Sequence, residues 1–355
     1  MPFPSSWLNQ ILVDDATEWQ HLAAKTALAD KLYAKAFGIT SENVEEVVKE
    51  RSHLLRSIYP DFSQFCQTTL HQPPDSILLT LWWLWLPLAM QLASYRQAQS
   101  NTLIQGILGG QGTGKTTLAA ILSLILRHLG YRTLSLSLDD LYKTYSDRLA
   151  LQQQDPRLIW RGPPGTHDIQ LGLTVLDRLR QSVADTPIQI PRFDKSACQG
   201  AGDRATPETI NGADIVLFEG WFVGVRPIAP SSFDAAPPPI ITPDDREFAR
   251  DNNNRLKDYL PLWERLDRLI LLYPVDYHLS QEWRKHAEHQ MMATGKSGMD
   301  NTQIEEFVKY FWRSLHPDLF IKPLCQDSRW IDLVIQINRD RSLGKVYRPV
   351  DLNDE

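Results

Sequence analysis

The glycine-rich stretch at residues 109–116 (GGQGTGKT) constrains the fold of this chain more than any other part of its sequence. It fits the pattern G-x-x-x-x-G-K-[ST], a loop that binds phosphate between a strand and a helix. Its flanks agree, because the run 103–108 before it is strand-like and the run 118–126 after it is helix-like. Glycines let backbone amides surround phosphate oxygens, and the helix N-terminus adds partial positive charge. The stretch therefore predicts a P-loop that binds a nucleoside triphosphate.

The P-loop supplies the first candidate site residues. Lys115 can reach the β- and γ-phosphates, and the Thr116 hydroxyl can bind Mg²⁺. Lys115 is therefore a catalytic candidate as well as a nucleotide contact. The predicted nucleotide contacts in and beside the loop are Gly110, Gln111, Gly112, Thr113, Gly114, Lys115, Thr116 and Thr117.

Composition narrows the function classes. Apolar residues make up 43% and charged residues 23% of the 355 residues, which is typical of a globular protein with a sizeable core. The net charge of −6 argues against a broad nucleic-acid-binding surface, although it leaves room for a local basic pocket. The three cysteines are far apart and form no C-x-x-C pair, which favours a reducing cytoplasm without zinc or disulfides. The first residues lack a basic stretch, so we expect no signal peptide.

Residues 77–93 (ILLTLWWLWLPLAMQLA) are nearly uncharged and need a membrane test. The run is shorter than the roughly 20 residues of a spanning helix, and Pro87 interrupts it. Trp82, Trp83 and Trp85 would point in different directions on a helix. We therefore expect a buried core helix, covered on most sides, and no membrane partner.

Two regions differ in their pattern. Residues 1–100 have helical spacing and no catalytic motif, which predicts a helical region packed on the core. Residues 101–355 alternate strand-like and helix-like segments, the signature of an α/β, doubly wound, mainly parallel sheet. The strand candidates lie at 103–108, 133–138, 188–190, 215–218, 269–273 and 333–337.

Acidic residues follow two of these strands. Asp139 and Asp140 come after the strand at 133–138, and Glu219 follows the strand at 215–218. Ligands of such sheets bind beyond the carboxyl ends of the strands, so these acids should meet the P-loop. A carboxylate beside the γ-phosphate can accept the proton of an attacking hydroxyl. We assign this catalytic role to Asp139, with Asp140 as a helix cap, although the two can be exchanged, and we assign Glu219 to Mg²⁺.

Three loop-like segments are rich in cations, at residues 161–168, 191–196 and 200–204. An anionic acceptor would need such cations, ideally including an arginine that binds it through two hydrogen bonds. The alternative is that they form salt bridges with the acids in the same segments. The predicted acceptor-binding residues here and beside Asp139 are Asp140, Tyr142, Arg161, His167, Arg192, Lys195 and Arg204.

A polar helix is predicted from Trp283 onward, followed by the glycine-containing segment 294–298. Such a helix can close over the phosphates and exclude water, with Arg284 as a nucleotide contact. An ordinary solvated helix is the alternative.

These segments together resemble the D-glycerate 3-kinase family of plants, cyanobacteria and fungi. The resemblance covers about residues 100–340 and rests on the P-loop and on SLDDLY, RGPPGTHD, PRFDKSA, GAGDR, LFEGWFVG and WRKHAE. That family belongs to the P-loop kinases that include phosphoribulokinase, uridine kinase and bacterial pantothenate kinase. The resemblance implies ATP and Mg²⁺ as cofactors, D-glycerate as the acceptor, 3-phosphoglycerate as the product, and a photorespiratory role. It also implies that Asp139 is the base.

Other functions remain to be distinguished. The nearest alternative is a kinase of the same group that phosphorylates a nucleoside, pantothenate or a sugar phosphate. A GTPase would usually carry an Asn-Lys-x-Asp motif, which this sequence lacks. An assembly ATPase usually has Asp-Glu after its Walker B strand, whereas the corresponding strand of this chain ends in Phe218-Glu219-Gly220. The oligomeric state is not predicted.

Overall fold

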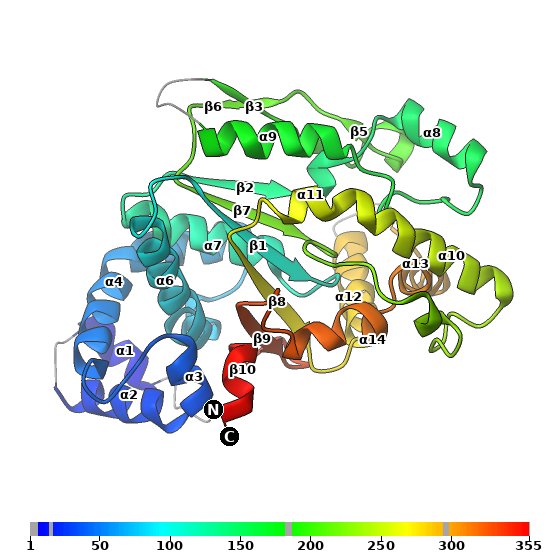
Figure 1. Cartoon of the computed structure of the whole chain (residues 1–355). Helices are drawn as coiled ribbons and strands as arrows, with labels where there is room; N and C mark the ends of the chain where they lie inside the picture. Colours follow the sequence, from blue (N-terminus) through cyan, green and yellow to red (C-terminus); the bar gives the residue numbers. More distant parts are fainter. Residues whose placement is uncertain (1–5, 14–16, 182–186, 294–297, 355) are drawn as a thin grey trace.

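A six-stranded sheet forms the centre of the computed structural model, which describes residues 6–13, 17–181, 187–293 and 298–354 (Figure 1). The strand order is β10-β9-β8-β1-β7-β2. The strands from β9 to β2 are parallel, and β10 pairs antiparallel with β9. Their bounds are β1 (Leu103–Gly109), β2 (Thr133–Ser137), β7 (Ile215–Gly220), β8 (Arg268–Pro274), β9 (Leu333–Ile337) and β10 (Leu343–Tyr347). The predicted α/β fold with a mainly parallel sheet is confirmed.

One predicted strand has another partner. Residues 188–190 do form β3 (Ile188–Ile190), but β3 pairs antiparallel with β6 (Glu208–Ile210) outside the central sheet. A second small ladder joins β4 (Phe193–Asp194) to β5 (Asp203–Arg204). A three-residue segment such as Ile-Gln-Ile indicates extended backbone but carries no information on its partner. Its placement among the strands of the parallel sheet was therefore wrong.

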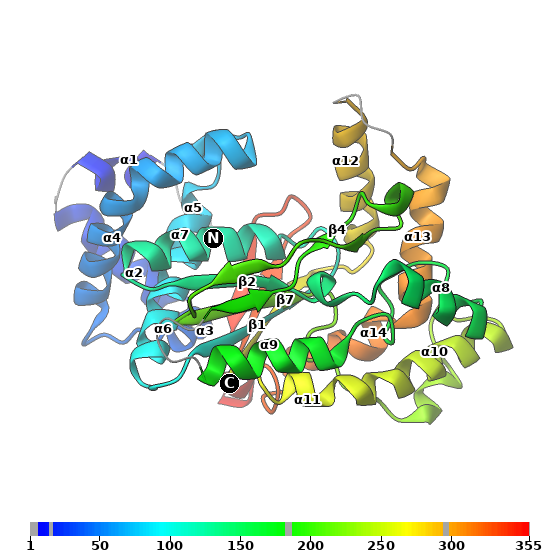
Figure 2. The ribbon, with the colours of Figure 1, turned by 90° about the horizontal axis from the view of Figure 1, so that it is seen from above.

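Helices cover both faces of the sheet, because successive strand residues point to opposite sides. Ile104 and Leu108 of β1 belong to one hydrophobic core, whereas Leu103 and Ile107 belong to the other. Figure 2 shows α7 on one side of the sheet and α9 and α11 on the other. Beyond the amino-terminal region, the helices are α7 (Lys115–His128), α8 (Tyr145–Gln154), α9 (Ile169–Gln181), α10 (Pro243–Arg255), α11 (Leu260–Trp263), α12 (Leu279–Ala293), α13 (Asn301–Ser314) and α14 (Pro317–Phe320).

The amino-terminal helices share a core with the sheet. They are α1 (Ser6–Val13), α2 (Thr17–Ala29), α3 (Lys31–Ala36), α4 (Val44–Phe65), α5 (Leu78–Thr80) and α6 (Leu86–Gln97), and Figure 1 shows them gathered at one end of the molecule. Their buried side chains form one cluster with α7 and with the same face of β1, β7 and β8. The apolar run 77–93 spans α5, a π-helical turn (Leu81–Trp85) and most of α6, and all three of its tryptophans are buried. Among the described residues, no helix is long and apolar enough to cross a membrane.

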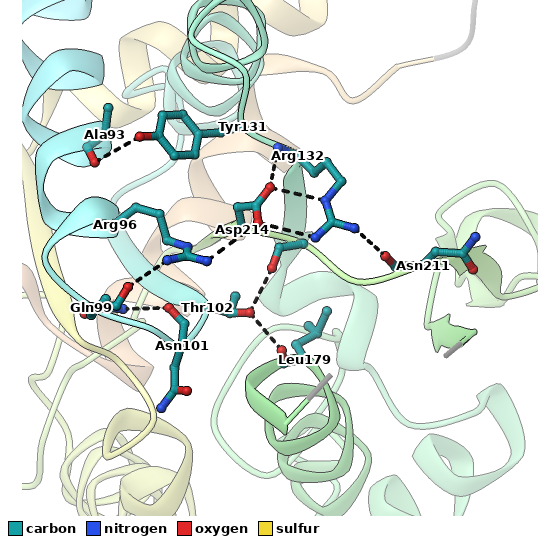
Figure 3. Close-up of polar contacts among 11 residues, drawn as sticks. Ala93, Arg96, Gln99, Asn101, Thr102, Tyr131, Arg132, Leu179, Asn211 and Asp214 are labelled. Atoms are coloured by element: carbon teal, nitrogen blue, oxygen red, sulfur yellow. Dashed lines mark hydrogen bonds and ion pairs between the residues drawn. The ribbon is translucent and has the colours of Figure 1, made fainter. Parts of the chain in front are cut away.

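A polar network closes the edge of the sheet opposite to the P-loop (Figure 3). Asp214, just before β7, accepts hydrogen bonds from the backbone (2.8 Å) and the guanidinium (3.2 Å) of Arg132, just before β2. Arg96 of α6 lies 3.7 Å from the same carboxylate. The Thr102 hydroxyl, just before β1, lies within 2.9 Å of carbonyl oxygens before β7 and in α9. The network therefore ties α6 to the amino ends of three parallel strands.

Candidate active site

The strand register brings the P-loop and the acidic residues to one edge of the sheet. Glu219 of β7 pairs with Ile107 of β1 on one side and with Ser137 of β2 on the other. The P-loop begins at Gly109, the last residue of β1, and Asp139 follows Ser137 by two residues. Glu219 lies within β7 rather than after it, so the strand predicted at 215–218 was two residues too short at its carboxyl end. Because parallel strands end at the same edge, the register explains why these groups meet.

The P-loop has the backbone that the glycine pattern predicts. Gly112 and Gly114 have φ values of +76° and +84°, which side chains other than glycine rarely adopt. The Thr113 hydroxyl donates to the Gly110 carbonyl oxygen at 2.8 Å, and Lys115 donates its ammonium to the same oxygen at 2.9 Å. Gln111 lies between Gly110 and Gly112 in the loop, and Thr117 lies in the first turn of α7. The Lys115 side chain therefore bends back onto the backbone of its own loop.

The charges around Lys115 show that the candidate residues share one site. Burial lowers the pKa of its ammonium group, while the carboxylates of Glu219 and Asp139 act to raise it and Lys195 acts to lower it. The influence of one charge on another falls with distance, so these four groups lie near one another. Phosphate oxygens entering this space would restore the pKa of Lys115 by giving its charge a partner.

Thr116 and Glu219 provide suitable oxygen ligands for Mg²⁺. The Thr116 hydroxyl lies 3.3 Å from a Glu219 carboxylate oxygen, and Glu219 is only 7% exposed. No group of three or more His, Cys, Asp or Glu side chains that could hold a metal occurs among the described residues. Magnesium in phosphate-transferring enzymes typically takes one or two protein oxygens and completes its shell with water and phosphate. The residues present therefore fit Mg²⁺ bound together with a nucleotide.

Asp139 carries an ionised carboxylate. Burial alone would raise its pKa, but the ion pair and hydrogen bond with Lys195 and a hydrogen bond with Tyr142 outweigh burial, so the pKa lies below its usual value. The Lys195 ammonium lies 2.6 Å from the Asp139 carboxylate, and the Lys195 side chain is 64% exposed. An ionised carboxylate can accept a proton, and an exposed lysine can reorient toward an incoming ligand.

Asp140 has a structural task, but not the one predicted. The helix cap at this position is Ser137, and Asp140 is the third residue of the 3-10 turn Leu138–Leu141. Its carboxylate accepts the backbone N–H of Ser137 at 3.0 Å, which completes a capping box, and pairs with Arg192 at 3.0 Å. This arrangement points Asp140 toward the protein framework and leaves Asp139 beside Lys115.

The predicted acceptor-binding cations differ in how they are held. Arg192 pairs with Glu208 (2.6 Å) as well as with Asp140, and Arg204 pairs with Asp168 (2.7 Å). The guanidinium of Arg161 donates to two carbonyl oxygens, of Gly200 and Ala201, at 2.8 and 2.9 Å. The salt-bridge alternative therefore describes Arg204, whereas Arg192 is paired with two acids that lie outside the three segments. Lys195 differs from these arginines because its ammonium pairs with Asp139 itself.

His167 brings no positive charge to the site, contrary to its grouping with the cations. It is 1% exposed, and burial lowers its pKa to about 3, so the imidazole is neutral near pH 7. The Tyr259 hydroxyl lies 2.7 Å from Nδ1 and accepts the Gly165 amide at 2.9 Å. The ring stacks on Tyr142, with centroids 4.5 Å apart, and so supports the residue that hydrogen-bonds Asp139.

Helix α12 reaches the P-loop, but through a residue that was not predicted. Arg284 pairs with Glu288 one turn along α12 and lies 5.3 Å from the Phe307 ring, so its head group is held between α12 and α13. Trp283 is the contact with the P-loop, because a Cβ atom at Gly112 would lie 2.8 Å from its Cβ atom. Most of the predicted closing segment, residues 294–297, lies outside the described residues.

Three supporting residues gave no signal in the sequence. Trp283 packs on the P-loop, Tyr259 orients His167, and Arg148 donates to the carbonyl oxygens of Ala201 and Gly202 at 2.8 and 2.5 Å. Each acts on a residue more than 50 positions away in the chain. Only the folded chain brings such partners together.

Comparison with known proteins shows the family of this chain. The chain is 30% identical over 221 residues to the "Probable ATP-dependent kinase TDA10" of Saccharomyces cerevisiae, a match that covers 58% of this chain and 74% of that protein. It is 28% identical over 253 residues to "D-glycerate 3-kinase, chloroplastic" of Arabidopsis thaliana, covering 68% of this chain and 53% of the plant protein. This chain belongs to the D-glycerate 3-kinase family of P-loop kinases. No protein-family model matches it.

A solved structure of the D-glycerate 3-kinase family has the same fold. The D-glycerate 3-kinase of Cryptococcus neoformans superposes with a TM-score of 0.64 at 27% identity, over 74% of this chain and 99% of that chain. The match to the plant D-glycerate 3-kinase spans about half of that protein's length. The expected family placement is therefore confirmed by sequence and by fold.

Proposed function

We propose that this chain transfers the γ-phosphoryl group of ATP to a hydroxyl group of D-glycerate, giving 3-phospho-D-glycerate. The observation that carries the proposal is the site shared by Lys115, Glu219 and Asp139, in which Asp139 also faces Lys195. The fungal and plant relatives named as D-glycerate 3-kinases support the choice of acceptor. The yeast relative named as an ATP-dependent kinase supports the choice of donor.

In the proposed mechanism, the protein acts by positioning and by charge. The amides of residues 110–116 and the Lys115 ammonium hold the phosphates at the start of α7. Thr116 and Glu219 would hold Mg²⁺, which neutralises charge on the phosphate oxygens when it is bound. Asp139 accepts the proton of the acceptor hydroxyl as the oxygen attacks the γ-phosphorus; the bond from this phosphorus to the β,γ-bridging oxygen breaks, ADP leaves, and the proton is held on the Asp139 carboxylate.

Lys195 is the residue we assign to the acceptor carboxylate. Its ammonium has three donors, and one contact with Asp139 leaves donors for a second anion. A carboxylate bound to Lys195 would leave the far hydroxyl of D-glycerate facing Asp139, which fits transfer to the 3-position. Tyr142 supports this arrangement through its hydrogen bond to Asp139.

The three cysteines of the chain are free in the structure, which supports our placing of the activity in the cytoplasm. The proposed product is a phosphorylated hydroxy acid, and the proposal includes the expected part in photorespiratory carbon recovery.

An acceptor panel tests the proposal. ADP release would be measured by a coupled assay with ATP, Mg²⁺ and each of D-glycerate, L-glycerate, uridine and pantothenate. We expect the highest kcat/KM with D-glycerate, and phosphorus NMR should show a 3-phosphate monoester. A higher kcat/KM with uridine or pantothenate would replace the proposed acceptor by that compound. ADP release at the same rate with and without every acceptor would contradict the proposal that this chain is a kinase.

A further inference from the structure

The strand order leaves one direction for the base of the nucleotide. Asp139, in the turn after β2, and Glu219 of β7 lie on one side of β1 and mark where the γ-phosphate must face the acceptor. The ribose and base then extend to the other side of β1, over the carboxyl ends of β8 and β9. Helix α12 and the turn between β9 and β10, residues 338–342, occupy that side.

This turn is fixed to the P-loop through α12. The Trp283 indole N–H donates to the Arg339 carbonyl oxygen at 3.1 Å, and Arg339 also pairs with Glu282. Trp283 in turn packs against Gly112. The turn, the helix and the P-loop therefore form one continuous wall that starts at the phosphate site.

Arg341 has an unusual backbone for an arginine. Its φ is +66°, in the left-handed region that favours glycine or asparagine. Hydrogen bonds from the Arg341 amide to the Asn338 carbonyl (2.9 Å) and from the Asn338 amide to the Ser342 carbonyl (3.0 Å) close this turn. Three-residue hairpin loops of this kind usually have glycine in the left-handed position. The backbone alone therefore gives no reason for arginine, and strain of this sort is concentrated at functional sites.

The Arg341 side chain is available to a ligand. The residue is exposed, and its guanidinium carbon lies 5.7 Å from the centre of the Trp283 ring. The Arg341 side chain makes no hydrogen bond or ion pair with any residue that the structure describes. By contrast, Arg339 two residues earlier is engaged by Glu282. A planar guanidinium with one face near an indole can stack its other face on an aromatic base.

We propose that the turn at residues 338–342 is the base-side wall of the nucleotide site and that Arg341 stacks on the base of the bound nucleotide. This inference rests on the proposed nucleotide-binding function and adds a specific residue to it. The phosphates contact residues 110–117, so Arg341 contributes to affinity through the base alone.

Isothermal titration calorimetry of the Arg341→Gly variant tests the inference with two probes, ADP and inorganic triphosphate. Glycine is the residue that the turn geometry prefers, so this variant should fold at least as well as the wild type. Loss of one stacking contact should raise the Kd for ADP about 2- to 30-fold. The Kd for inorganic triphosphate, which has no base, should not change. Arg329→Ala, an exposed arginine before the amino end of β9, is the matched control and should leave both Kd values unchanged.

Each result has a distinct meaning. An unchanged Kd for ADP in Arg341→Gly would overturn the inference, and so would an equal loss of affinity for ADP and inorganic triphosphate, because Arg341 would then act on phosphate. A wild-type protein that binds neither probe would instead contradict the proposed function.

Discussion

Replacing Asp139 by asparagine tests the central residue of the proposed mechanism. Asparagine keeps the shape of the side chain and an oxygen that can accept the Tyr142 hydrogen bond, but it cannot take up a proton. A general base typically contributes 10²- to 10⁴-fold to the rate, so kcat with D-glycerate should fall by about that factor. This corresponds to about 3–5 kcal/mol in the activation free energy.

The same substitution should have little effect on folding or on nucleotide binding. The Lys195 partner is 64% exposed, and exposed ion pairs typically contribute about 0–1 kcal/mol to stability. The loss of up to 1 kcal/mol lowers Tm by only a few degrees in a domain of this size. The Kd for ADP should be unchanged or lower, because a negative charge near the phosphates is removed. Coupled ADP release, thermal unfolding and calorimetry measure these three quantities.

Asp140→Asn is the matched control, because it changes the neighbouring carboxylate in the same way. Asp140 completes the capping box of the turn after β2 and pairs with Arg192, so its replacement should cost about 1 kcal/mol of stability. Its effect on kcat should be much smaller than that of Asp139→Asn. A folded Asp139→Asn protein with near wild-type kcat would refute the assignment. If Asp140→Asn were the more damaging change, the role of base would pass to Asp140.

Four further predictions follow from the same geometry. In Lys195→Met, the lysine no longer opposes the effect of burial, so the pKa of Asp139 should rise. Because the base works deprotonated, the acid limb of the pH profile of kcat/KM should move to higher pH. An unmoved acid limb together with a wild-type KM for D-glycerate would contradict both roles of Lys195. Glu219→Gln removes a charge from the expected metal site, so half-maximal activity should require more Mg²⁺, and an unchanged Mg²⁺ titration would exclude Glu219 as a ligand. Gly112→Ala and Gly130→Ala each place a side chain at a positive φ, which should cost about 1–2 kcal/mol of stability at either position. Only the alanine at position 112 would meet Trp283, so only Gly112→Ala should weaken ADP binding in calorimetry. Equal ADP affinities of the two variants would contradict a role of Trp283 at the nucleotide site. The truncated chain 101–355 exposes the core shared with the amino-terminal helices, so it should lose its near-UV circular dichroism, whereas a cooperative unfolding transition would show that residues 1–100 are dispensable for folding.

The P-loop and the strands around it could be predicted from local sequence. The conformation of the loop depends on glycines at positions that need positive φ, and Gly112 and Gly114 stand at two of them. The positions of these strands were predictable because apolar runs such as 103–108 and 215–218 are buried on both faces in a parallel sheet, although both strands extend beyond the predicted ends. The proximity of Asp139, Glu219 and Lys115 followed from the rule that parallel strands end at one edge.

Side-chain partners could not be predicted in the same way. The sequence shows four cations in the loops after β2, but only the fold decides that Arg192 and Arg204 are held by acids while Lys195 faces Asp139. The charge of His167 is also a tertiary property, since burial beside Tyr259 and not the residue type makes the imidazole neutral. The free energy of a charge depends on its neighbours and on solvent, and both come from distant segments.

The sequence by itself determined that this chain has a phosphate-binding loop in an α/β sheet with acids at the same edge, because those features depend on neighbouring residues and on the strand period of two. The tertiary structure decided which acid faces the lysine of the loop, which cations are available, and that Trp283 and the turn at residues 338–342 complete the wall beside the P-loop. These contacts join residues that are tens to hundreds of positions apart, and only packing of the whole chain brings them within reach of one another.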